Sequence, residues 1–350
     1  MIGKKLSKKQ KTALITGVAG QDGSYLTEHL ISIGYRVIGL LRRTSNLNRE
    51  RIDQIDRNNF ILEWGDVTDP VSVSRCLVAY KPDEIYHLAA QSHVGVSFLA
   101  PLSTAEITGF GTSVLLEAAF IHCPEAKFYN AATSELFGGL PEQGNQSENT
   151  PFYPRSPYAV SKLYGYWATV NARESRPQFA VNGILFNHES PRRGHNFVTK
   201  KICSESVKIL EGKTDVLNLG NLDAVRDWGY APEYVQAMHM MLQTDKPVDL
   251  VIGTGLGMTV REFATKTFLC HGVDIEWTGS GVNECGIDVN TGKELIKVSA
   301  DLYRPAEVER LISNSEKAFK TIGWRPSIIG DKLVELLTEH EINEFRARNG

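Results

Sequence analysis

Four residues that can carry out acid–base chemistry lie close together in the middle of the chain. Tyr158 and Lys162 stand four positions apart, a spacing that places both side chains on one face of a helix. A phenol with an ordinary pKa of about 10 is a weak base at neutral pH, but a neighbouring ammonium favours its ionised form. Thr133 and Glu135 supply a hydroxyl and a carboxylate a short distance earlier in the chain. A tyrosine and a lysine at this spacing are also common on surface helices, so the assignment needs support from the rest of the chain.

A glycine-rich turn near the start of the chain predicts a dinucleotide site. The sequence GVAGQDG at residues 17–23 directly follows a short apolar run and opens a segment with helical periodicity. Glycine is needed where a tight turn lets the backbone approach a pyrophosphate, whose charge then meets free N–H groups at a helix N-terminus. Ordinary turns also collect glycine, but a strand before and a helix after favour the cofactor interpretation. The expected cofactor contacts in this turn are Gly17, Gly20, Gln21, Asp22 and Gly23.

The end of the second expected strand favours NADP over NAD. Arg42 and Arg43 follow that strand, and no acidic residue stands there to bind a ribose 2′-hydroxyl. We expect Arg42 to hold the 2′-phosphate through a forked contact. A solvated basic loop is the alternative, and Arg49 and Arg51 leave a role in a subunit interface open. Further cofactor contacts are expected after the third and fourth strands, at Asp66, Val67, Leu88, Ala89, Ala90, Gln91 and Ser92.

The order of apolar runs and helical segments predicts the α/β class, with a Rossmann-type doubly wound parallel sheet and a smaller mixed α/β substrate lobe. The expected strands are residues 12–16, 35–41, 60–64, 84–89, 127–131 and 180–186, and the expected helices are residues 24–33, 71–80, 104–121 and 158–173. We expect an NADP-binding domain over residues 1–187 that also receives residues 216–256. Residues 188–215 and 257–350 then form the nucleotide-sugar lobe.

Composition narrows the classes of partner. The chain has 350 residues, with 38 Lys and Arg against 41 Asp and Glu, so it lacks the basic field that nucleic acid requires. No apolar stretch approaches the roughly 18 residues needed to span a bilayer. Five scattered cysteines lack the paired spacing of a zinc site, and no other metal site is expected. We therefore expect a cytoplasmic protein that binds neither nucleic acid nor membranes.

Several motifs together resemble the extended short-chain dehydrogenase/reductase family and, within it, the GDP-mannose 4,6-dehydratases. They are GVAGQDG at 17–23, TSE at 133–135, PFYPRSPYA at 151–159, NHESPRRG at 187–194, RDW at 226–228 and YRPAEV at 303–308. The segment at 187–194 is the most diagnostic, because generic members of the larger family lack it. The resemblance implies conversion of GDP-mannose to GDP-4-keto-6-deoxymannose by a lyase that uses NADP and assembles as a homodimer or homotetramer.

The same resemblance implies roles for individual residues. Tyr158 would take the proton of the C4 hydroxyl, and Lys162 would hold both the ribose and the tyrosine. Glu135 would remove the C5 hydrogen and protonate the departing C6 hydroxyl, while Thr133 would hydrogen-bond the C4 oxygen. The remaining implied contacts are His188 and Arg193 for the cofactor, and Asn187, Arg226 and Arg304 for the GDP part of the substrate.

Three positions depart from the family pattern and keep alternatives open. Ala132 and Ser103 replace hydroxyl-bearing residues that are common in relatives, and Tyr230 stands where histidine is common. The segment between Gly281 and Tyr303 is also shorter than usual. Tyr230 and this segment are expected on the substrate side of the molecule, so dehydration of another GDP-hexose or heptose is an alternative. A nucleotide-sugar 4-epimerase or reductase is another, although such an enzyme has no reason to carry Glu135. A catalytically inactive NADP-binding scaffold is the alternative outside the enzymes.

Overall fold

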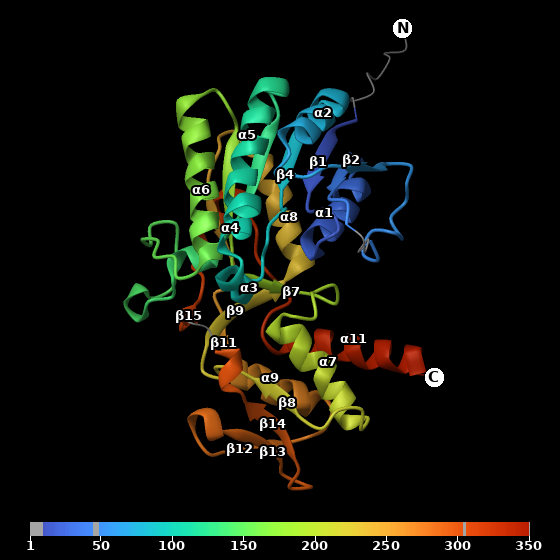
Figure 1. Cartoon of the computed structure of the whole chain (residues 1–350), viewed down its shortest axis with the longest axis vertical. Coiled ribbons are helices and arrows are strands. Elements are labelled where there is room, and N and C mark those ends of the chain that lie inside the picture. Colours follow the sequence, from blue (N-terminus) through green and yellow to red (C-terminus); the bar gives the residue numbers. More distant parts are fainter. Residues whose placement is uncertain (1–9, 45–48, 304–305, 350) are drawn as a thin grey trace.

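The computed structural model describes residues 10–44, 49–303 and 306–349, which form a large lobe and a smaller lobe below it (Figure 1). The large lobe is built on a seven-stranded sheet in the order β10-β6-β5-β4-β1-β2-β3, with every pair parallel. Strand order reverses between β1 and β4, and in such sheets ligands bind beyond the carboxyl ends of the strands. The strands are β1 (Thr12–Thr16), β2 (Arg36–Leu41), β3 (Phe60–Trp64), β4 (Glu84–His87), β5 (Lys127–Thr133), β6 (Ala180–Leu185) and β10 (Leu250–Ile252).

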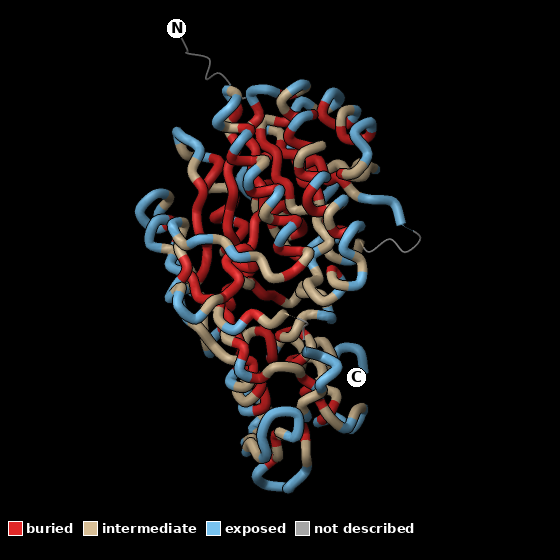
Figure 2. The backbone as a smooth tube through the Cα atoms, turned by 60° about the vertical axis from the view of Figure 1, so that its left-hand side comes forward, coloured by how far each residue is buried: buried red, intermediate tan, exposed pale blue. Residues whose placement is uncertain are grey.

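Helices cover both faces of this sheet. On one face lie α1 (Gln21–Ser32) and α8 (Ala231–Leu242), and on the other lie α2 (Pro70–Tyr80), α5 (Gly111–His122) and α6 (Pro157–Ser175). Side chains of β1 alternate between the two cores: Ala13 and Ile15 pack with residues of α1 and α8, whereas Leu14 packs with residues of α2 and α5. Figure 2 shows the middle of this sheet as a buried layer, and the edge strand β3 is the least buried of its strands. A sheet buried on both faces is what near-continuous apolar strands predict.

The small lobe contains a four-stranded sheet in the order β12-β13-β14-β8, and a second small sheet lies where the lobes meet (Figure 1). The strands of the first are β8 (Leu217–Leu219), β12 (Ile275–Thr278), β13 (Cys285–Asp288) and β14 (Glu294–Val298). The second contains β7 (Asn187–Glu189), β9 (Val225–Tyr230), β11 (Gly257–Thr259) and β15 (Arg310–Leu311). The helices of this part are α7 (Val198–Leu210), α9 (Val260–Cys270) and α11 (Asp331–Asn349).

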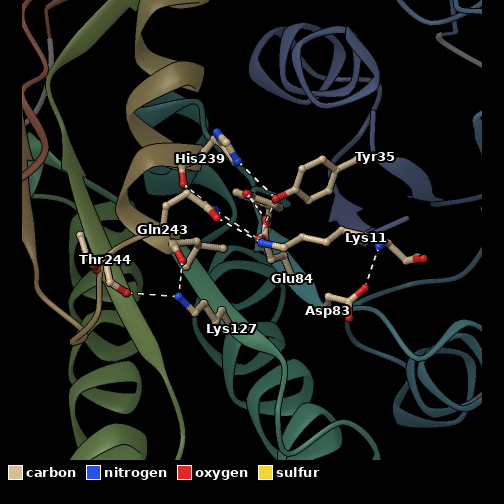
Figure 3. A network of polar contacts seen from close by, with 11 residues as sticks. Lys11, Tyr35, Asp83, Glu84, Lys127, His239, Gln243 and Thr244 are labelled. Carbon is tan, nitrogen blue, oxygen red and sulfur yellow. Dashed lines mark hydrogen bonds and ion pairs between the residues drawn. The ribbon is translucent and has the colours of Figure 1, made fainter. Parts of the chain in front are cut away.

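A polar network closes the amino-terminal edge of the large sheet, opposite the end where ligands bind (Figure 3). The Glu84 carboxylate is 1% exposed and accepts hydrogen bonds from Lys11 Nζ at 2.9 Å and from Tyr35 Oη at 2.9 Å. Tyr86 and Gln243 donate two more. Burial raises the pKa of Glu84, but these donors outweigh burial and bring the pKa below its ordinary value.

The expected elements agree with the structure in kind and differ at some boundaries. All six expected strands are present, and the strand expected at 127–131 runs on to Thr133. The helix expected over 104–121 is divided into α4 (Pro101–Thr104), a π-helical stretch (Ala105–Phe110) and α5. Short helices also occur at α3 (Val94–Leu99), α10 (Glu316–Ile322), Ser134–Phe137, Pro141–Gln143, Gly281–Asn283 and Ala300–Leu302.

Two segments pack across the expected division of the chain into lobes. Within 216–256, α8 and β10 join the large lobe, but β8 pairs with β14 of the small lobe because its apolar residues complete that sheet. Within 257–350, α10 packs on β10 and α8, and its residue Ala318 belongs to the core of the large lobe. No helix of residues 10–44, 49–303 and 306–349 combines the length and the apolar character needed to cross a membrane.

Candidate active site

Tyr158 and Lys162 lie buried on the first turns of α6. The helix begins there because the Ser156 side chain accepts a hydrogen bond from Ala159 N at 3.0 Å and Pro157 occupies its first position. Tyr158 is 8% exposed and Lys162 is 5% exposed. Lys162 Nζ donates a hydrogen bond to Ala131 O at 2.6 Å, at the end of β5.

Burial sets the protonation behaviour of both side chains. Burial lowers the pKa of Lys162 to about 8, against an attraction from the charge of Asp22. Burial also raises the pKa of Tyr158, assisted by the charge of Glu135 and opposed by a hydrogen bond with Thr133. In the chain itself, desolvation is the largest influence on the pKa of Tyr158 and raises it.

Thr133 and Glu135 come to the same place from the end of β5. The Thr133 side chain accepts a hydrogen bond from Glu135 N at 3.2 Å and so caps the short helix Ser134–Phe137. Thr133 and Glu135 are 8% and 7% exposed. The Thr133 side chain hydrogen-bonds the Tyr158 phenol, and the charge of the Glu135 carboxylate is near enough to raise the pKa of that phenol. The structure thus brings together the four residues singled out from the sequence.

The glycine turn has the shape that a dinucleotide requires. Gly17 has φ +70°, and a Cβ there would lie 2.8 Å from Ala89 N. A Cβ at Gly23 would lie 2.4 Å from Gly17 O, so both positions need glycine for the turn to close on itself. A Cβ at Gly20 would meet only Gly17 O within 4 Å, at 3.1 Å, so this side of the turn is open. Gly20 also begins α1 without a side-chain cap, which leaves helix N–H groups to meet a pyrophosphate.

The segment that follows β4 is hydrogen-bonded to the end of β1, the strand that leads into this turn. Thr16 Oγ1, at the end of β1, accepts hydrogen bonds from Leu88 N and Ala89 N, both at 3.2 Å. Ala90 follows them half-buried, Gln91 N donates to Thr108 Oγ1 at 3.0 Å, and Ser92 is exposed.

The residues expected around the adenosine part lie at the ends of β2 and β3. Asp66 and Val67 follow β3, and the Asp66 carboxylate accepts hydrogen bonds from Thr68. Arg42 is exposed directly after β2. Arg51, for which the sequence left an interface role open, folds back onto its own chain and donates to Arg192 O at 2.8 Å and to Ala19 O at 3.3 Å.

The segment at 187–193 lies against the start of α1. His188 Nε2 is 2.8 Å from Asp22 Oδ2, and Ser190 Oγ donates to Gln21 Oε1 at 2.8 Å. Arg193 Nε is 3.1 Å from the Glu189 carboxylate, and its guanidinium lies 3.7 Å from the centroid of the Phe197 ring. The sequence singled out most of these residues as cofactor contacts, but it gave no signal for their pairing, because the partners lie more than 160 positions apart.

Two of the three residues expected to hold the GDP part are described. Asn187 pairs with Trp228 where β7 runs beside β9, and Arg226 is on the same strand as Trp228. Arg226 is 6% exposed, donates to Val225 O at 3.0 Å and approaches the Glu307 carboxylate at 3.8 Å. Arg304 lies outside the described residues.

Comparison with known proteins decides the family. A family model described as GDP-mannose 4,6 dehydratase matches residues 14–337. The chain belongs to the GDP-mannose 4,6-dehydratase family. The GDP-mannose 4,6 dehydratase 2 of Caenorhabditis elegans is 49% identical, covering 97% of this chain and 91% of the relative. The human GDP-mannose 4,6 dehydratase is 47% identical, covering 97% and 94% respectively.

Solved structures of more distant proteins share the fold of this GDP-mannose 4,6-dehydratase family member. A UDP-glucose 4-epimerase from Thermotoga maritima superposes with a TM-score of 0.79 at 23% identity, covering 97% of this chain and all of the other. A dTDP-glucose 4,6-dehydratase from Bacillus anthracis, solved with NAD, has a TM-score of 0.79 at 20% identity, covering 96% and 98%. At these identities the likeness establishes the Rossmann-type fold alone.

Proposed function

We propose that the chain removes water from GDP-mannose to form GDP-4-keto-6-deoxymannose, with NADP as cofactor. The observation that carries this proposal is the meeting of Thr133, Glu135, Tyr158 and Lys162 beside the glycine turn. Membership of the GDP-mannose 4,6-dehydratase family supports the choice of substrate. The enzyme is accordingly an NADP-dependent hydro-lyase.

In the first half of the reaction, the oxidation at C4, the acting residues are Tyr158, Thr133 and Lys162. NADP, when bound, accepts a hydride from C4 and returns it to C6, so the reaction involves no net oxidation. Tyr158 accepts the proton of the C4 hydroxyl as the C4 carbonyl forms, and Thr133 donates a hydrogen bond to the same oxygen. The ammonium of Lys162 is proposed to bind the ribose hydroxyls and, by its positive charge, to favour the ionised form of Tyr158 during the reaction.

In the second half of the reaction, the loss of water across C5 and C6, the acting residue is Glu135. The new carbonyl at C4 acidifies the C5 hydrogen, and Glu135 removes it as a general base. The same carboxyl then gives its proton to the departing C6 hydroxyl, which leaves as water. With hydride returned to C6, the proton that Tyr158 took from the C4 hydroxyl would pass to C5, which completes the product and restores the ionised phenol.

The other site residues bind the two nucleotides. Arg226, Asn187 and Arg304 are proposed to hold GDP, because a diphosphate favours arginine forks. The cofactor contacts are proposed to be Gly17, Gly20, Gln21, Asp22, Gly23, Arg42, Asp66, Val67, Leu88, Ala89, Ala90, Gln91, Ser92, Lys162, His188 and Arg193. In this proposal the large lobe binds NADP and the small lobe binds the nucleotide sugar.

We also propose that the chain works in the cytoplasm as a homodimer or homotetramer. All five cysteines are free and three of them are buried, which suits a reducing compartment. The face formed by α5 and α6 supports self-association, because Ile121, Val160 and Trp167 are each more than half exposed there, as is Phe110 directly before α5. Trp167→Asp is expected to shift the sedimentation coefficient to that of a monomer, and a monomeric wild type would contradict the proposal.

Replacing Glu135 tests the chemistry separately from binding. Glu135→Gln is expected to retain NADPH binding in a fluorescence titration but to lose GDP-4-keto-6-deoxymannose, measured as the loss of 18 Da from GDP-mannose by mass spectrometry. Glu174→Gln, an exposed position on the same helix as Tyr158, is the matched control and should keep wild-type turnover. Normal product formation by Glu135→Gln would refute the role of the carboxylate.

A panel of nucleotide sugars tests the substrate. Tyr230, at the end of β9, departs from the family pattern and keeps another GDP-hexose or heptose as the second candidate. We expect loss of water from GDP-mannose and not from UDP-glucose. Faster dehydration of a different GDP-sugar would replace the substrate while leaving the reaction class intact, and inversion at C4 without loss of water would indicate an epimerase.

A further inference from the structure

Both ring nitrogens of His188 face groups that only accept hydrogen bonds. Nδ1 lies 2.7 Å from Phe186 O, a backbone carbonyl, and Nε2 lies 2.8 Å from Asp22 Oδ2. A neutral imidazole carries one hydrogen and can donate only one of these two bonds. Satisfying both acceptors therefore requires the doubly protonated ring, which carries a positive charge.

The ring is fixed in this position by its surroundings. The His188 side chain is 10% exposed and stacks on Tyr234 of α8, with ring centroids 4.6 Å apart and planes 24° apart. Gln21 Nε2 ties the pair together, donating to Asp22 Oδ1 at 3.0 Å and to His188 O at 3.0 Å. The contact is thus part of a built network that joins α1 to β7.

Asp22 is an unusual residue for its position. It is the second residue of α1, within the turn that the proposed function assigns to the diphosphate of NADP. The negative charge of a carboxylate in such a turn repels the phosphates that the helix N-terminus attracts. The turn can hold an anion tightly only if another group neutralises this carboxylate.

We propose that His188 is a fixed cation whose function is to neutralise Asp22, so that the glycine turn accepts the diphosphate of the cofactor. In this inference His188 is a positioning residue that acts on cofactor binding through Asp22, in place of the direct cofactor contact proposed for it above. This inference rests on the proposed function, since it concerns the same cofactor site.

The charges around the pair agree with this assignment. Burial lowers the pKa of His188, but the charge and hydrogen bond of Asp22 outweigh burial and raise it above its ordinary value. Burial likewise raises the pKa of Asp22, but the charge and hydrogen bond of His188, with a hydrogen bond from Gln21 and the charge of Arg193, together more than reverse this effect. The groups that face His188 are Asp22 from α1, Tyr234 from α8 and Arg193 from its own segment, and only Arg193 opposes the protonated ring by charge.

A double-mutant cycle on NADPH affinity tests the inference. His188→Gln keeps a donor toward Asp22 but removes the charge, and we expect the NADPH dissociation constant to rise about tenfold or more. Adding Asp22→Asn to this variant removes the carboxylate that the His188 charge no longer neutralises. The NADPH dissociation constant of the double variant should therefore return to within about threefold of wild type. A direct contact between His188 and the cofactor predicts no such rescue.

The outcomes separate this inference from the proposed function. If the wild-type chain binds no NADPH, the proposed function fails. If the wild type binds and the double variant binds as weakly as His188→Gln, the inference fails while the proposed function stands. Arg173→Gln is the control for general destabilisation, because it breaks a buried pair with Asp249 (2.6 Å). Arg173→Gln should lower the melting temperature without changing the NADPH affinity. If Arg173→Gln lost as much NADPH affinity as His188→Gln, the inference would be overturned.

A spectroscopic measurement on the wild type keeps the inference falsifiable if a variant does not fold. At pH 7.5 a histidine of ordinary pKa is about nine-tenths neutral. Burial lowers the pKa of four other histidines, His29, His87, His239 and His271. Nitrogen-15 NMR of the histidine-labelled chain should reveal one doubly protonated ring at this pH, which Asp22→Asn abolishes. A spectrum of the wild type without a doubly protonated ring would overturn the proposal.

Discussion

Replacing Lys162 with methionine should make the chain inactive but more stable. Lys162 is 5% exposed, and its ammonium hydrogen-bonds one backbone carbonyl, Ala131 O, at 2.6 Å. Methionine has a similar length and no charge to desolvate. Since the proposed reaction needs this ammonium to hold the ribose and to favour ionised Tyr158, turnover should fall by orders of magnitude.

The size of the stability change follows from the pKa of Lys162. Burial lowers that pKa from 10.5 to about 8. A pKa difference of one corresponds to about 1.4 kcal/mol. The folded state therefore disfavours the ammonium of Lys162 by about 3 kcal/mol at neutral pH. Losing the hydrogen bond to Ala131 O offsets about 1 kcal/mol. We therefore expect Lys162→Met to raise the free energy of unfolding by about 2 kcal/mol at pH 7.

The pH dependence of this difference has a defined sign. A base with a lowered folded pKa destabilises the fold fully below that pKa, and the effect disappears as pH rises toward the unfolded value. The advantage of Lys162→Met should thus be complete below pH about 8 and shrink between there and pH 10.5.

Urea unfolding of the ligand-free chain, followed by circular dichroism at pH 7 and pH 10 at one protein concentration, measures the difference. Lys11→Met is the matched control, for which the expected change in the free energy of unfolding has the opposite sign. Burial lowers the pKa of Lys11, but the hydrogen bond and charge of Glu84 outweigh it and raise that pKa, so losing this lysine should destabilise the chain. A Lys162→Met variant less stable than wild type at pH 7, or a gain independent of pH, would refute the reasoning.

Two further predictions concern the glycine turn and the network at the opposite edge of the sheet. Gly23→Ala places a Cβ 2.4 Å from Gly17 O, so the turn must open and NADPH fluorescence titration should detect little binding; wild-type affinity would show that the turn tolerates the methyl group. Glu84→Gln should lower the free energy of unfolding by about 2 kcal/mol at pH 7, because its four donors lose a charged acceptor. The pKa of Glu84 is lowered in the fold, so the difference in unfolding free energy between wild type and Glu84→Gln should disappear as the pH falls through that pKa. A difference that stays constant into acid would contradict a stabilising role for the Glu84 carboxylate.

Local patterns were sufficient for the framework of the molecule. The strand at 12–16, the glycine turn and the following helix are close in sequence, and each constrains its neighbours through backbone geometry. The spacing of Tyr158 and Lys162 likewise fixes their common face on α6. The break of the helix expected at 104–121 into a π-helical stretch had no comparable local signal.

The sequence by itself determined the doubly wound sheet and the position of the glycine turn, and it singled out the residues that are proposed to form the active site. Only the tertiary structure decided their electrostatics: the raised pKa of Tyr158, the lowered pKa of Lys162 and the pairing of His188 with Asp22. The physical reason is that periodicity and turns act over a few residues. Desolvation and charge pairing depend instead on which distant segments fold against a side chain, and Asp22 and His188 lie 166 positions apart.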